Sequence, residues 1–453
     1  MRVIFAVFAA TMATVASATG ESPEVANSSA LVGPFEANSF ISRPEVDRFP
    51  LETARVARVR TLASSGEGSL REALALTGPR LVVFEVGGVV DLEGVALEIR
   101  EPFVFVAGET APKPGITLIR GSLVIQTDHV IVRHVAVRPG DGRPDPKQEW
   151  MPDGITIVRG KAPVHDVLVQ NCSATWAVDE NMSASGPRDT RPSAGVDATA
   201  HDVAFRSNLI GEALLNSTHP KGAHSMGLLV HDGVRNVAID GNLFAHNRER
   251  NPRLKGGVTA TVTNNIIYDW GSAAIGVGSK GNEETLDGVR ALVRGNVAIG
   301  GADTKGRVLV RAVDPGASIN ATFNVARDAK GVDLADLDAG ITRLVEGESS
   351  AGGPRPDLAA TVSAVLRGAG ARPAERDAID RRIVQSVIDG TGRIIDSQEQ
   401  VGGYPKRVAT RRTLKVPDGA ANRAAWLEQM MKALEFDSTV DPSPLLNRLK
   451  LPR

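Results

Sequence analysis

The stretch VAIDGN, residues 237–242, and the stretch TVTNN, residues 261–265, decide the fold. In both, apolar side chains alternate with polar ones, which predicts half-buried strands. Each run closes on an asparagine, a residue that tolerates the tight turn at a corner. Asn242 and Asn265 are 23 residues apart, which is close to the length of one coil of a β-solenoid.

The same theme recurs along the middle of the chain. Similar short runs occupy 130–134, 167–171, 203–207, 292–296 and 321–324. Five of the runs have asparagine at the equivalent position of the repeat, and stacked asparagine side chains can hydrogen-bond to one another from coil to coil; these residues are Asn208, Asn242, Asn265, Asn296 and Asn324. We therefore expect an all-β fold, a right-handed parallel β-helix over about 60–330.

The two ends of the chain have a different character. Residues 1–18 combine Arg2, an apolar run and a small-residue Ala-Ser-Ala site, which predicts a secretory signal peptide and a secreted, extracellular or periplasmic protein. Residues 19–59 are expected to form an N-terminal arm. Residues 331–453 form a C-terminal extension in which 374–388 and 421–434 have helical apolar stripes, and we expect this extension to pack on the solenoid.

The composition excludes several classes of partner. Lys and Arg number 52 and Asp and Glu 53, so no overall charge attracts nucleic acid or an anionic membrane. No segment after the signal is long and apolar enough to predict a membrane span. Cys172 is the single cysteine, which excludes an intramolecular disulfide. We expect a monomer.

A local cluster of cations stands out against this balance. Arg248, Arg250, Arg253 and Lys255 fall within eight positions between two predicted strands, with Pro252 stiffening the backbone among them. Cations this close repel one another unless an anion lies nearby. The cluster is either a solvated basic loop or a platform for a polyanion.

Several motifs resemble the pectate lyase superfamily, polysaccharide lyase family 1. They cover most of 60–330 and are GPRLVVF at 78–84, AGETAP at 107–112, HVAVRPGD at 134–141, NCSATWAVDE at 171–180 and RNPRLK at 250–255. The tail, with VGGYP at 401–405, also resembles bacterial members. Gln170 and Asn171 stand where the family has Asp-His, a departure at a strand end.

The resemblance implies a pectate lyase, which cleaves polygalacturonate by β-elimination and leaves unsaturated products. It implies Arg250 as the base and Lys255 as a second cation, with Lys221 binding the substrate carboxylate. Arg253 and His219 are expected to bind substrate. The resemblance also implies that neighbouring cations lower the proton affinity of Arg250, since like charges disfavour its protonated form.

Calcium is the cofactor that the resemblance implies, and calcium prefers hard oxygen ligands. The candidate ligands are Asp153, Asp179, Glu180 and Asp197. Adjacent residues of an extended segment point to opposite sides, so only one of Asp179 and Glu180 is expected to bind the ion directly.

Three alternatives stay open. A pectin lyase would act on the methyl-esterified polymer without calcium, although the acidic cluster and the aromatic content of only 4% disfavour it. A lyase of another uronate polysaccharide would use the same cations. A non-catalytic β-helix would only bind polysaccharide. A polygalacturonase-type hydrolase is disfavoured because the sequence has no Gly-His-Gly motif.

Overall fold

The fold was obtained as a computed structural model. The structure describes residues 49–143, 145, 147, 149–159, 164–186, 199–279, 288–313, 316–344, 355–406 and 409–451. The expected signal peptide, 1–18, and most of the expected arm, 19–59, lie outside these residues. Within them, no helix is long and apolar enough to cross a membrane.

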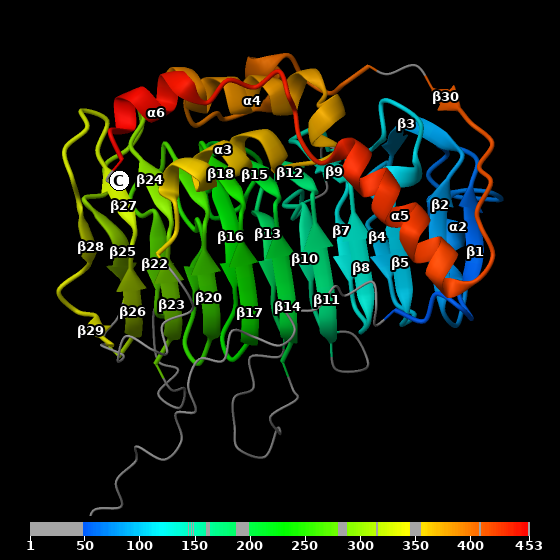
Figure 1. The fold of residues 1–453 in the computed structure, drawn as a ribbon, viewed down its shortest axis with the longest axis horizontal. Coiled ribbons are helices and arrows are strands. Elements are labelled where there is room, and N and C mark those ends of the chain that lie inside the picture. Colours follow the sequence, from blue (N-terminus) through cyan, green and yellow to red (C-terminus); the bar gives the residue numbers. More distant parts are fainter. Residues whose placement is uncertain are drawn as a thin grey trace, which may run out of the picture.

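The chain winds through three sheets in a fixed order, one strand of each sheet per coil (Figure 1). The first sheet contains β1 (Arg55–Val59), β2 (Arg80–Phe84), β5 (Val104–Ala107), β8 (Val130–Arg133), β11 (His165–Gln170), β14 (His201–Arg206), β17 (Arg235–Asp240), β20 (Thr259–Thr263), β23 (Arg290–Arg294), β26 (Ser318–Thr322) and β29 (Thr342–Arg343).

The second sheet contains β3 (Val86–Asp91), β6 (Ile116–Ile119), β9 (Val135–Arg138), β12 (Ser173–Thr175), β15 (Leu209–Gly211), β18 (Leu243–Ala245), β21 (Ile266–Tyr268), β24 (Val297–Ile299), β27 (Val325–Arg327) and β30 (Thr410–Arg411). The third sheet contains β4 (Leu97–Ile99), β7 (Leu123–Ile125), β10 (Ile155–Ile157), β13 (Glu180–Ala184), β16 (Met226–Val230), β19 (Arg253–Leu254), β22 (Ile275–Val277), β25 (Val308–Ala312) and β28 (Ala335–Leu337).

Parallel pairing between successive coils makes this fold a right-handed parallel β-helix, so the predicted fold class is confirmed. Every run singled out in the sequence overlaps a strand of the first sheet. The sequence does not predict the individual strands of the second and third sheets. Most of these strands are only three residues long, which is too short to show an alternation of apolar and polar residues. Their apolar side chains fill the interior of the solenoid together with those of the first sheet.

The asparagines stack as expected in one buried ladder between the first and second sheets. Each side-chain amide donates to the oxygen of the next asparagine at 2.9–3.0 Å, from Asn208 to Asn242, Asn265, Asn296 and Asn324. The left-handed turn falls one residue earlier than we inferred: Ser207 has φ 54° and Gly241 has φ 66°. The ladder asparagines therefore bond across the corner, and the residues before them make the turn.

The C-terminal extension covers the outside of the solenoid (Figure 1). Its helices are α3 (Leu358–Gly368), α4 (Ala378–Asp389), α5 (Ala420–Leu434) and α6 (Ser443–Leu449), and α2 (Leu70–Ala75) lies near the N-terminal end. Apolar residues of α3, α4 and α6 pack on the outer face of the second sheet, and Leu427 of α5 packs on that of the first sheet. Buried Arg138 of β9 fastens α4 by ion pairs of 2.7 Å to both Asp377 and Asp380. The C-terminal helices are thus peripheral, as predicted.

Candidate active site

The predicted site residues gather at the beginning of neighbouring strands of the third sheet. Asp153 lies two residues before β10, Asp179 directly precedes β13, and Glu180 is the first residue of β13. Arg250 lies three residues before β19, with φ 64°. β10, β13, β16 and β19 are successive strands of one parallel sheet. Residues that precede these strands therefore lie close together, although they are far apart in the sequence.

Three carboxylates form the acidic part of the site. One oxygen from each of Asp153, Asp179 and Glu180 lies within 4.8 Å of the others, so both members of the adjacent pair reach the cluster. Asp153 accepts hydrogen bonds of 3.0 Å from the Glu180 N–H and the Ser183 hydroxyl. Burial, and then the charge of Asp179, raise the pKa of Asp153 to about 7. Such crowding of carboxylates indicates a place for a cation.

The Arg250 guanidinium forms an ion pair with the Glu180 carboxylate in this cluster. The pKa of Arg250 is lowered to about 10, chiefly by burial; the charge of Arg253 acts in the same direction, and the charges of Asp179 and Asp153 oppose the change. Desolvation is therefore the main cause, rather than the crowding of cations that we expected. Within the described residues, the buried Arg250 Nε has no hydrogen-bond partner and stays available as a donor.

Two stacked histidines border the cluster at Asp179. The rings of His219 and His224 lie 3.8 Å apart and nearly parallel. His224 Nε2 is 2.6 Å from Asp179 Oδ1, and His219 Nε2 is 3.6 Å from Asp179 Oδ2. Burial alone would raise the pKa of Asp179, but the hydrogen bond and charge of His224 lower it overall.

The sequence alone did not identify His224 as a site residue. The available signal was its spacing of five residues from His219, but two histidines in a turn do not by themselves indicate a shared partner. His219 and His224 are both buried, and with Asp179 they form a second group whose ligand atoms lie within 4.8 Å. His219 thus lies against a carboxylate of the cluster.

The other expected cations are placed differently. Lys255 pairs with buried Asp232, which also accepts a hydrogen bond from Ser279. The pKa of Asp232 is well below its usual range because hydrogen bonds from His231, Lys255 and Ser279 outweigh its desolvation. Lys255 is therefore held by a partner of its own. Lys221 is exposed on a turn, where its backbone N–H donates to His219 Nδ1 at 3.1 Å.

Two further residues complete the comparison with the predicted site. Arg253 belongs to β19 and donates from Nη2 to the Gly278 carbonyl at 2.8 Å, close enough to Arg250 to lower its pKa. Asp197 lies outside the described residues, so its place in the site stays a prediction.

A cleft of about 890 Å³ adjoins the site. Ala223, next to His224, and Arg248, two residues before Arg250, contribute to its wall. The opposite wall comes from α4 and the segment after it, including Arg382, Arg393 and Ile394. The cleft lies between the solenoid and its C-terminal covering, and its volume is sufficient for a ligand larger than one sugar.

Fold and site together define a parallel β-helix protein with a cluster of carboxylates, histidines and one half-buried arginine beside its third sheet. No protein-family model matches the chain, and no curated protein matches it.

Solved structures similar in chain path include the major allergen from cedar pollen, at 13% identity and TM-score 0.46, covering 69% of this chain and 87% of the allergen. A Bacillus subtilis pectate lyase mutant is 12% identical with TM-score 0.46, covering 70% and 91%. An alginate lyase from a Paenibacillus species is 14% identical with TM-score 0.43, covering 64% and 99%. The strand order of this chain establishes the β-helix, and identities this low say nothing about activity.

Proposed function

We propose that this protein is a lyase of acidic polysaccharides that cleaves a uronate polymer by β-elimination. The observation that carries the proposal is Arg250: a half-buried guanidinium, ion-paired within a cluster of three carboxylates, whose pKa is lowered to about 10. The lowered pKa enlarges the neutral fraction of Arg250 at pH 7 relative to an arginine at its ordinary value of 12.5. Burial thus makes the neutral base more available.

The reaction needs a proton to leave the carbon next to the uronate carboxylate. A neutral nitrogen of Arg250 takes this proton, the electron pair of the C–H bond becomes a carbon–carbon double bond, and the glycosidic oxygen leaves the neighbouring carbon with the electrons of the C–O bond and takes up a proton from water. The substrate lies along the third sheet and into the cleft lined by Arg248. Arg253 and His219, beside Arg250 and Asp179, are our proposed contacts for the substrate.

The carboxylate cluster fits calcium. Three carboxylates face one guanidinium, so the cluster carries excess negative charge, and their oxygens are the hard ligands that calcium prefers. Asp153, Asp179 and Glu180 would hold the ion, and Asp197 is a further proposed ligand. Calcium bound there would neutralise the substrate carboxylate and make the neighbouring proton more acidic.

Polygalacturonate is the substrate that we propose, in a secreted monomeric enzyme. Purified protein without residues 1–18 should raise the ultraviolet absorbance of polygalacturonate as unsaturated ends form. Arg250→Ala should lose about 100-fold or more of this rate, while Arg100→Ala, which removes an exposed arginine paired with Glu98, should keep it. A rise in absorbance with alginate or methyl-esterified pectin alone would change the substrate but keep the reaction.

A second candidate is a non-catalytic β-helix that binds acidic polysaccharide. The ion pairs of Arg250 with Glu180 and of Lys255 with Asp232 favour it, because both cations are engaged before any ligand arrives. Binding of polygalacturonate in calorimetry, with no absorbance and no new reducing ends, would support this candidate. New reducing ends without absorbance would indicate a hydrolase and exclude both proposals.

Calcium binding can be measured separately from lyase activity. Calorimetric titration of the metal-free protein should show calcium binding that Asp179→Asn weakens at least tenfold. The matched control is Asp328→Asn, which changes an exposed carboxylate far along the chain that bonds to the Val332 N–H. Equal calcium binding by both variants would exclude the carboxylate cluster as the site.

A further inference from the structure

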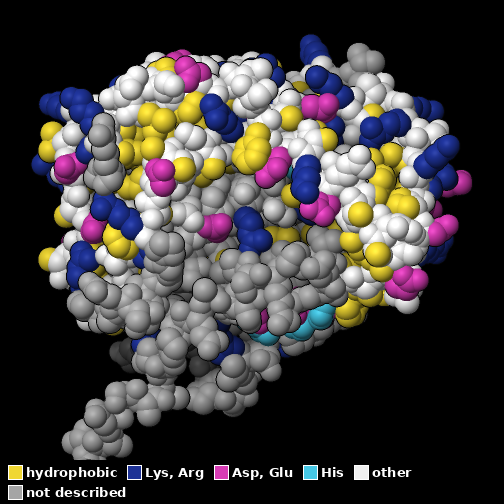
Figure 2. Space-filling model, in the orientation of Figure 1, with side chains coloured by type: hydrophobic (Ala, Val, Ile, Leu, Met, Phe, Trp, Pro, Cys, Tyr) yellow, Lys and Arg dark blue, Asp and Glu magenta, His cyan; other side chains and the backbone are white. Residues whose placement is uncertain are grey.

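A second histidine–carboxylate cluster lies away from the candidate active site, at the beginning of strands in the first sheet. Of the eight histidines in the chain, only His129, His165 and His201 are not buried. They follow one another at intervals of 36 residues. Figure 2 shows histidine side chains at the lower edge of the molecule, beside acidic side chains. These histidines belong to the first sheet or directly precede it, whereas Arg250 precedes β19 of the third sheet.

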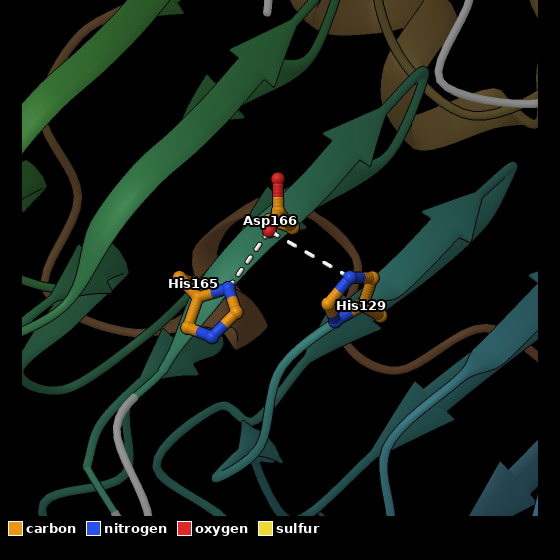
Figure 3. Close-up of side chains that lie close together, drawn as sticks. All are labelled: His129, His165 and Asp166. Atoms are coloured by element: carbon orange, nitrogen blue, oxygen red, sulfur yellow. Dashed lines mark hydrogen bonds and ion pairs between the residues drawn. The ribbon is translucent and has the colours of Figure 1, made fainter. Parts of the chain in front are cut away.

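Register brings the side chains of this cluster together. Val130 of β8 pairs with Val167 of β11, so the preceding residues, His129 and Asp166, are neighbours across the two strands. Figure 3 shows Asp166 between the rings of His165 and His129. One ring nitrogen of each histidine and one Asp166 oxygen lie within 4.8 Å of one another. These three ligand atoms are close enough to bind one ion after small side-chain rotations.

Hydrogen bonds fix the orientation of both rings. His129 Nδ1 lies 2.8 Å from Asp128 Oδ1, and His165 Nδ1 lies 2.7 Å from Asp166 Oδ2. An ionised carboxylate only accepts hydrogen bonds, so each Nδ1 carries a proton. Each Nε2 of a neutral ring is therefore a bare acceptor. Pairing of one ring nitrogen with a carboxylate is the arrangement that orients histidines toward metal ions.

Those bare nitrogens face further acceptors. His129 Nε2 lies 3.8 Å from Asp166 Oδ2, and His165 Nε2 lies 3.9 Å from Asp128 Oδ2. Within the described residues, neither Nε2 makes a hydrogen bond. Two acceptors that face each other at this separation repel unless a positive charge bridges them. A proton or a metal ion supplies that charge.

We propose that His129, His165 and Asp166 form a binding site for a divalent transition metal ion of the zinc type. Imidazole and carboxylate ligands suit such ions, and sites with three protein ligands commonly complete their coordination with water. The side chains of His129, His165 and Asp166 are 37%, 28% and 33% exposed, so an ion and its water can enter from solvent. Bound there, the ion would join β8 to β11.

His201 provides a matched control one rung further along. Its ring stacks on that of His165 at 5.0 Å and pairs with Asp202 at 2.7 Å, so it shares the exposure and the hydrogen bonding of the other two. It is not part of the three-residue group. Replacing His201 tests whether metal binding requires His129 and His165 specifically or any surface histidine of this row.

The experiment must separate this site from the Asp179 group. In an Asp179→Asn/His224→Gln background, calorimetry with Zn²⁺ should give one equivalent of binding, and Co²⁺ should give the visible absorption of a four-coordinate ion. His165→Gln and His129→Gln should each remove this binding, and Asp128→Asn should weaken it about 10- to 100-fold. His201→Gln should leave it unchanged.

Circular dichroism of each variant checks that it is folded. Zn²⁺ should raise the melting temperature of the background protein and not that of His165→Gln. The proposal is overturned if the background protein binds no Zn²⁺ at millimolar concentration, which would leave a proton as the bridging charge. It is equally overturned if His165→Gln binds as the background does.

Discussion

The Arg250 guanidinium pairs with the Glu180 carboxylate across two rungs of the third sheet, one residue from the histidine-bound Asp179. This ion pair connects the arginine to the carboxylate cluster of the candidate active site. It holds the base in place, and it also favours the protonated arginine. The activity we propose therefore depends on how strongly the surrounding charges oppose that pairing.

Replacing Arg250 should destabilise the fold as well as stop the reaction. Arg250→Met leaves three neighbouring carboxylates without their guanidinium, and we expect the free energy of unfolding to fall by about 3–5 kcal/mol in urea titrations. Calcium should restore part of this loss because it supplies the missing positive charge. Arg100→Met, at an exposed ion pair, should lower it by only about 0–1 kcal/mol. If calcium did not restore any of the lost free energy of unfolding, the result would contradict the idea that calcium and the Arg250 guanidinium neutralise the same carboxylates.

The rate of β-elimination should rise with pH. The neutral fraction of Arg250 increases tenfold per unit of pH below its pKa of about 10. We expect kcat/KM on polygalacturonate to follow that slope from pH 7 to 9 at fixed calcium concentration. A profile that is flat over this range would exclude Arg250 as the base.

Stability without metal should fall as pH rises through the titration of Asp153. The pKa of this carboxyl is about 7 in the folded protein, above its ordinary value of 3.8, so the folded state holds the proton more tightly. The free energy of unfolding therefore decreases from about pH 4 to about pH 7 by this contribution. Asp153→Asn should remove it, which urea titrations in the presence of chelator can measure. Calcium should cause proton release near pH 6.

Lys255 should behave as a structural cation. Lys255→Met leaves buried Asp232 without its charged partner, so we expect a loss of about 3–5 kcal/mol in the free energy of unfolding. Because the pKa of Asp232 is depressed in the folded state, its contribution is present above its unfolded pKa and lost in acid. Lys221→Met, on an exposed turn, should change stability by less than about 0.5 kcal/mol. Wild-type stability of Lys255→Met would make Lys255 available for catalysis after all.

The asparagine ladder should be strongest in its middle. Asn242→Ala removes bonds to Asn208, Asn265 and the Phe205 carbonyl in a fully buried corner. We expect a loss of about 2–5 kcal/mol, since each orphaned buried group costs about 1–3 kcal/mol. Asn324→Ala, at the half-buried end, should cost clearly less in the same urea titrations. Equal losses would mean that the bonds act locally rather than as a ladder.

The sequence predicted the fold because its first sheet repeats a pattern that one strand per coil can reveal. Strands of three residues, such as β12 and β18, are too short to show an alternation of apolar and polar side chains. Two of the three sheets were therefore seen only in the structure. For the site, the motif around Arg250 placed the arginine among carboxylates. It could not show that Lys255 pairs with Asp232, because that contact depends on the register between coils, with loops of unequal length between them.

The position of β30 has a consequence for how the chain is made. Thr410 pairs with Gly87 of β3, 323 residues earlier, and the helices that cover the second sheet lie after residue 357. During synthesis the solenoid is therefore complete while the outer face of its second sheet is still bare. At roughly 5–20 residues per second, the remaining hundred residues take on the order of 5–20 s to appear. A chain whose synthesis stops in this interval exposes the apolar outer face of its second sheet, so the last fifth of the chain decides whether the product stays dissolved.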